Sequence, residues 1–88
     1  MRIREVEVAS RFERQYRKLP KAIREAAKEK EAIFRVNPFD PRLDTHKLHG
    51  KEKIAWAFSV NRRYRIKFIF LDEVHVLFLE IGTHEIYR

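Results

Sequence analysis

Residues 56–70 read WAFSVNRRYRIKFIF, and this stretch decides the fold. Apolar residues alternate with small, polar or charged ones through residues 54–60 and again through residues 64–70. An alternation with a period of two is typical of a strand that buries one of its faces. The intervening residues 61–63 are polar and favour a tight turn. The stretch therefore predicts two antiparallel strands joined as a hairpin.

The alternation also predicts which side chains each strand buries. Ile54, Trp56 and Phe58 share one face of the first strand, which we assign to the core. Arg65 and Lys67 should point away from the core on the second strand. A third strand is predicted over residues 74–81, where apolar residues occupy both faces. Such a strand is either central and covered on both sides or buried against a partner.

The amino-terminal half predicts one strand and two helices. Residues 2–8 contain β-branched residues at alternating positions and should form a strand. Ser10 and Glu13 have the spacing of a capping box at the start of a helix, which should end before Pro20. Because proline is favoured in a first helical turn, Pro20 should also open a second helix that ends at Pro38.

The order of these elements predicts the fold class. Two helices joined so closely should form a hairpin whose apolar stripes need a sheet to cover. We therefore expect an α+β fold with an N-terminal strand, a helical hairpin and then an antiparallel sheet of three or four strands. The additional strand would be a short one near residues 46–48. The chain of 88 residues is predicted to form a single domain, 1–88.

The charge of the chain points to its class of partner. Twenty Lys and Arg against thirteen Asp and Glu give a formal net charge of +7. A positive field around so small a body favours polyanions, above all nucleic acid. The alternative is that the charge only keeps a small domain in solution.

The composition also predicts what the protein lacks. It contains no cysteine, and no His/Cys set has the spacing of a structural zinc site. His46 and His49 lack a third ligand at suitable spacing, so we expect no metal and no cofactor. Residues 1–8 do not form an apolar signal core, and no stretch approaches the ~20 apolar residues of a membrane span. We expect a soluble, cytoplasmic protein without membrane contacts.

The predicted strand order gathers a set of chemically useful residues. Because the last strand ends beside the start of the one before it, residues 83–88 should lie near Arg63 and Arg65. His84 and Tyr87 would then join these arginines. Metal-free RNA cleavage needs a base for the ribose 2′-hydroxyl, cations for the charged phosphorane and an acid for the leaving 5′-oxygen. Histidine can supply either proton transfer near neutral pH, and the arginine fork suits a phosphate.

Other interpretations of the same residues remain open. His84 could be a solvated residue of the tail, and Tyr87 could anchor the tail to the core instead of stacking on a base. Arg65 could pair with Glu80 or Glu85 instead of a phosphate.

Further basic residues are candidates for RNA contacts. They occupy the turn, the second strand and the run before the first strand: Arg62, Arg63, Lys67, His46, His49, Lys51 and Lys53. Exposed arginines in turns are usually only solvated, so their role depends on their proximity to Arg65.

Three runs of sequence carry a resemblance to a known family. They are KLHGK at residues 47–51, WAFSVNRRYRI at residues 56–66 and IGTHEIY at residues 81–87. Together they resemble the RelE/StbE and YafQ-like toxins of type II toxin–antitoxin systems, over nearly the whole chain. The resemblance implies a RelE-like fold. It also implies a ribosome-dependent endoribonuclease that enters the A site, cuts the bound mRNA and is silenced by a cognate antitoxin.

The resemblance implies roles for individual residues. Arg65 matches the family's phosphate-holding arginine, and His84 matches the catalytic histidine of the Gly-Thr-His motif. His46 matches another active-site histidine. Tyr87 matches the terminal aromatic residue that orients or protonates the substrate.

The chain departs from the family pattern at three positions. YafQ-like members carry a histidine where this chain has Ser59 and an aspartate where it has Arg63. RelE itself has lysines where this chain has Ala57 and Ser59. Either His84 or His46 would therefore have to serve as the general base.

The leading hypothesis is an mRNA endonuclease. A ParE-like toxin that inhibits DNA gyrase without catalysis is the alternative, and a basic RNA-binding module is a third possibility. As a toxin, the protein should be monomeric alone and form a hetero-oligomer with an acidic, amphipathic antitoxin. Its further contacts would be with mRNA on the ribosome and with ribosomal RNA.

Overall fold

The computed structural model describes residues 2–50 and 54–87. Its elements follow one another along the chain in the order β1 (Glu5–Val8), α1 (Ser10–Arg17), α2 (Lys21–Val36), η1 (Pro41–Leu43), β2 (His46–Lys47), β3 (Trp56–Ser59), β4 (Arg65–Asp72), β5 (His75–Gly82) and η2 (His84–Tyr87). None of the described helices is long and apolar enough to cross a membrane.

The strands form one sheet in the order β1-β5-β4-β3-β2. The hairpins pair antiparallel, as predicted, and the short strand β2 lies at one edge. The α+β fold class is confirmed, but over the described residues the sheet has five strands and is mixed, because β1 pairs parallel with β5. Parallel strands require a long connection. Here the connection from β1 to β5 begins with α1 and α2 and continues through β2, β3 and β4. The sequence of β1 does not reveal which strand it joins.

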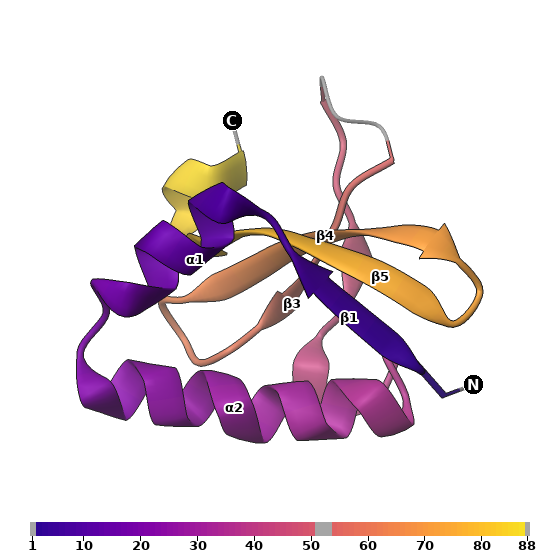
Figure 1. The fold of residues 1–88 in the computed structure, drawn as a ribbon, viewed down its shortest axis with the longest axis horizontal. Coiled ribbons are helices and arrows are strands. Elements are labelled where there is room, and N and C mark those ends of the chain that lie inside the picture. Colours follow the sequence, from indigo (N-terminus) through magenta and orange to yellow (C-terminus); the bar gives the residue numbers. More distant parts are fainter. Residues whose placement is uncertain (1, 51–53, 88) are drawn as a thin grey trace.

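The core lies between α2 and the sheet (Figure 1). Phe34 of α2 is completely buried. Its ring centroid lies 4.7 Å from that of Phe58, 4.9 Å from that of Phe68 and 5.6 Å from that of Phe78. One helical side chain therefore packs on the three central strands, as the alternation in residues 56–70 requires.

Two local predictions were wrong. Ser10 is the first residue of α1 and makes no capping-box contact, because the helix begins after Ala9, whose carbonyl accepts the N–H of Glu13 at 3.1 Å. Ala9 itself still donates to Phe78 at 2.9 Å, so the chain turns directly from the sheet into the helix. Ile54 is 69% exposed, because β3 begins only at Trp56.

Strand β5 is central, which explains its apolar residues on both faces. β1 covers its first half, from His75 to Phe78. Beyond the end of β1, the side chain of Gln15 in α1 contacts the same edge of β5. Its oxygen accepts the N–H of Ile81 at 2.9 Å. Its amide nitrogen donates to Glu80 at 3.2 Å. Both parts of this edge of β5 thus have hydrogen-bond partners, and strand addition there is blocked.

Candidate functional site

Two adjacent rows of residues cross the sheet face opposite α2. In the first row, Ala57 lies between His46 and Lys67, and Lys67 lies next to Glu80. In the second row, Arg65 lies between Ser59 and Gly82. Cross-strand neighbours share a face. The predicted proximity of the carboxyl-terminal segment to Arg65 is therefore confirmed.

The carboxyl-terminal turn η2 packs against β4 and β5 (Figure 1). Ile86 anchors it and is 6% exposed. A Cβ atom at Gly82 would lie 2.8 Å from Cγ2 of Ile86, so a larger residue would push the turn away. The glycine before Thr83 and His84 therefore has a packing role: it lets the turn approach the sheet.

Tyr87 contacts two histidines. Its ring centroid is 5.6 Å from that of His84 and 6.1 Å from that of His46, and both contacts are close to perpendicular. His46 comes from the edge strand β2, and both histidines are exposed. The structure thus brings together three of the predicted site residues, which come from distant parts of the sequence.

The imidazole of His46 has a defined orientation. Its Nδ1 atom lies 2.9 Å from the carbonyl oxygen of Asp44. A carbonyl can only accept, so Nδ1 must carry the hydrogen, and in the neutral ring Nε2 is then free to take a proton. Asp44 has a left-handed backbone conformation, with φ 50°. The sequence does not mark Asp44 for this role, because nothing in its aperiodic surroundings identifies a backbone carbonyl as a histidine partner.

Arg65 holds the turn between β3 and β4 together. Its Nη1 atom donates to the carbonyl of Asn61 at 2.6 Å and to those of Arg62 and Tyr64, each at 3.1 Å. The Asn61 side chain also accepts the N–H groups of Arg63 and Tyr64, at 2.9 and 2.8 Å. The turn thus fixes the Arg65 guanidinium in place.

The Tyr87 hydroxyl is the buried side-chain atom that lacks a hydrogen-bond partner among the described residues. Burial raises the pKa of Tyr87, and the nearby positive charge of Arg65 opposes this rise. Arg65 is thus close enough to act on the hydroxyl by its charge, although the two groups do not reach hydrogen-bond geometry. Tyr87 remains a neutral phenol near neutral pH and can donate a hydrogen bond.

Lys67 does not form part of the exposed basic surface that the sequence predicted. It is 3% exposed, and its Nζ atom lies 2.8 Å from Oε2 of Glu80. Glu80 also contacts Gln15 and, at 3.8 Å, Arg11 of α1. A buried charge requires a counter-ion, and Glu80 supplies it for Lys67. Because Lys67 is buried in this pair, it is not available to RNA in this conformation.

The Lys67–Glu80 pair predicts an acid-sensitive contribution to stability. Burial alone would raise the pKa of Glu80, but Lys67, Gln15 and Arg11 outweigh it and lower the pKa from 4.5. A carboxylate with a lowered pKa stabilises the fold above its unfolded value, and this contribution is lost as the pH falls through the folded value. Unfolding by urea should therefore become easier below about pH 4.5 in the wild type. In Glu80→Gln the fall should be shallower, whereas equal slopes would contradict the prediction.

The other predicted RNA contacts have different positions. Arg62 and Arg63 are exposed in the turn that Arg65 holds, so they extend the positive charge beside it. His49 is exposed and lies in the loop that follows β2. Lys51 and Lys53 lie outside the described residues.

Comparisons with known proteins identify the fold. No protein-family model matches the chain, and no curated protein is similar enough to match. Among solved structures, the toxin–antitoxin complex RelBE2 from Mycobacterium tuberculosis matches with a TM-score of 0.75 at 21% identity, over 91% of this chain and 96% of that one. YafQ from Escherichia coli matches with a TM-score of 0.72 at 18% identity, over 94% and 96%. The YoeB/ParE toxin from Agrobacterium tumefaciens matches with a TM-score of 0.78 at 10% identity, over 92% and 99%.

These matches cover nearly the full length of both chains, with TM-scores of 0.72 to 0.78. Because the sequence identities are only 10% to 21%, these matches show the fold of this chain and nothing more. The chain therefore shares the fold of these toxins.

Proposed function

We propose that this protein is the toxin of a type II toxin–antitoxin system and that it cleaves mRNA in the A site of the ribosome. The observation that carries the proposal is the grouping of His46, Tyr87 and His84 beside Arg65 on one sheet face. A site made of two imidazoles, a phenol and a guanidinium fits metal-free phosphoryl transfer. The fold shared with RelE, YafQ and YoeB toxins supports the same class of function.

His46 is the proposed general base. Its Nδ1–H is held by the Asp44 carbonyl, which leaves Nε2 to remove the proton from the ribose 2′-hydroxyl. The 2′-oxygen then attacks phosphorus, and the bond from phosphorus to the 5′-oxygen breaks. This step would leave a 2′,3′-cyclic phosphate on one fragment and a 5′-hydroxyl on the other.

His84 is the proposed general acid. Its ring lies against that of Tyr87, with 5.6 Å between the centroids, so an imidazole is present beside the site to protonate the leaving 5′-oxygen. Arg65 would stabilise the negative charge of the phosphorane, with Arg62 and Arg63 adding to the positive field. Tyr87 would position the nucleotide by stacking of its ring.

A cognate antitoxin is the proposed partner. The chain carries a formal charge of +7, so an acidic segment would be attracted to it. The solved complex RelBE2 is an example of a toxin of this fold bound to an antitoxin. Such a segment would silence the protein by covering the basic surface around Arg65, and the proposed state is a monomer alone and a hetero-oligomer with the antitoxin.

A non-enzymatic toxin that inhibits DNA gyrase is the second candidate. The fold shared with the YoeB/ParE toxin supports it, as does the absence of lysines at Ala57 and Ser59. Such a toxin has no use for two histidines beside an arginine, so the site favours the nuclease.

The test is to map mRNA 5′ ends in cells after induction of the protein, while following plasmid supercoiling in the same cultures. We expect cuts that follow the codon phase of translated messages and no early change in supercoiling. Growth arrest with altered supercoiling and without cuts would replace the nuclease by a gyrase inhibitor.

A further inference from the structure

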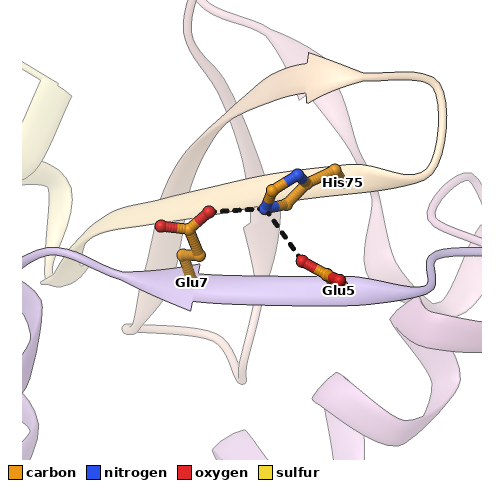
Figure 2. Close-up of side chains that lie close together, drawn as sticks. All are labelled: Glu5, Glu7 and His75. Atoms are coloured by element: carbon orange, nitrogen blue, oxygen red, sulfur yellow. Dashed lines mark hydrogen bonds and ion pairs between the residues drawn. The ribbon is translucent and has the colours of Figure 1, made fainter.

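A histidine and two carboxylates meet at the opposite edge of the sheet from β2. In the parallel pair β1–β5, His75 lies opposite Glu5, and Glu7 lies opposite Leu77. Glu5 and Glu7 are two residues apart and therefore point from the same face of β1. Figure 2 shows the two carboxylates approaching the imidazole from either side along the strand.

Both carboxylates converge on one ring nitrogen. Nε2 of His75 lies 2.5 Å from Oε2 of Glu7 and 3.5 Å from Oε2 of Glu5. One ligand atom from each residue lies within 4.8 Å of the other two. A proton on Nε2 satisfies this geometry, and a metal ion can take its place once the glutamate side chains rotate outward.

We propose that Glu5, Glu7 and His75 bind a divalent transition-metal ion, with Zn²⁺ as the best fit. One imidazole nitrogen and two carboxylate oxygens are ligands that Zn²⁺ takes at about 2.0–2.2 Å, with water in the remaining position. Ligand atoms around a tetrahedral ion at this distance are separated by roughly 3.4 Å. The side chains of Glu5 and Glu7 are 71% and 57% exposed, so small rotations can bring them to this spacing.

A further carboxylate lies on the other side of the imidazole, near its second nitrogen. Oδ2 of Asp72 lies 4.0 Å from Nδ1 of His75. Its other oxygen, Oδ1, accepts the N–H of Val74 at 2.9 Å, which ties Asp72 to the turn between β4 and β5. Histidines that bind metals commonly direct their second ring nitrogen at a carboxylate, which fixes the ring and raises its affinity.

The location gives the site a structural consequence. Within the described sheet, β1 is an edge strand that pairs with β5 alone. An ion held by two residues of β1 and one of β5 would cross-link this edge and stabilise the attachment of β1. The metal site lies at the edge of the sheet opposite to β2, which carries His46. Its residues take no part in the proposed RNA cleavage, so its test does not depend on the proposed function.

The experiment is a calorimetric titration of the purified full-length protein with ZnCl₂, followed by thermal unfolding with and without Zn²⁺. We expect one ion per chain and a rise in Tm of roughly 10–20 °C at a hundredfold excess over Kd. Co²⁺ should bind to the same site and give the visible absorption of a tetrahedral complex. MgCl₂ should have no comparable effect, because Mg²⁺ prefers octahedral oxygen ligands.

Three variants and a control test the ligands. His75→Gln and Glu7→Gln should weaken Zn²⁺ binding at least roughly tenfold and remove the rise in Tm, and Asp72→Asn should weaken it by about tenfold. His49→Gln removes a different exposed histidine and should bind Zn²⁺ as the wild type does. Absence of saturable binding would overturn the proposal, as would binding that His75→Gln leaves unchanged.

Discussion

Replacement of His84 by alanine should lower the rate of mRNA cleavage by roughly 100- to 10,000-fold, the usual contribution of a general acid. His84 is exposed, so its removal should leave the fold intact. The measurement is the rate at which purified protein cuts a defined message on ribosomes that carry it in the A site. Cleavage at the wild-type rate would remove His84 from the mechanism.

The pH dependence of this rate separates the two histidines. A general base must be unprotonated and a general acid protonated, so the wild-type rate should rise and then fall with pH. His46→Ala should remove the rise on the acidic side, and His84→Ala should remove the fall on the alkaline side. The opposite pattern would exchange the two roles.

Arg65→Lys is a better probe of Arg65 than Arg65→Ala. The guanidinium holds three carbonyls of the turn, so the alanine variant would lose turn stability together with any phosphate contact. Lysine keeps the positive charge but lacks the fork that binds a phosphate through two bonds. A loss of cleavage in Arg65→Lys, at an unchanged midpoint of urea unfolding, would assign Arg65 to the substrate.

Phe34→Ala should lower the free energy of unfolding by about 3–5 kcal/mol. Phe34 is completely buried and packs on Phe58, Phe68 and Phe78, so the variant would leave a cavity between α2 and the three central strands. A domain of this size has a total stability of only about 5–10 kcal/mol. The variant should therefore unfold at a much lower urea concentration than the wild type, and the measurement is the midpoint of urea unfolding.

Phe39→Ala is the matched control for Phe34→Ala. Phe39 is 45% exposed and makes one edge contact with Trp56, at 5.5 Å between centroids, and one stacked contact with Phe70, at 6.1 Å. Its loss should cost about 1 kcal/mol, because the remaining gap is open to water. Similar losses for the two variants would mean that α2 does not organise the core as described.

The sequence by itself determined the parts of the fold that depend on periodicity. The alternation in residues 56–70 predicted β3 and β4 and the burial of Phe58 and Phe68. The two prolines, Pro20 and Pro38, marked the limits of α2 to within a residue or two. The antiparallel order also predicted that the carboxyl-terminal segment lies near Arg65, because register fixes which strand ends are neighbours.

Several features depended on contacts between distant segments, which periodicity does not encode. The parallel pairing of β1 with β5 is one of them, and the burial of Lys67 against Glu80 is another. The sequence marked Lys67 only as a residue on the outer face, whereas neighbouring side chains decided that it is buried and paired. The orientation of His46 likewise depends on a backbone carbonyl, which any residue could supply.

The candidate metal ligands illustrate this difference most clearly. The spacing of residues along the chain does not reveal this metal site, because Glu7 and His75 are 68 residues apart. The parallel register then places them in hydrogen-bond contact and adds Glu5 to the same nitrogen. Local patterns therefore determined the strands, helices and much of the core of this protein. Only the tertiary structure decided which polar side chains meet, because such contacts depend on how strands far apart in the chain pair within the sheet.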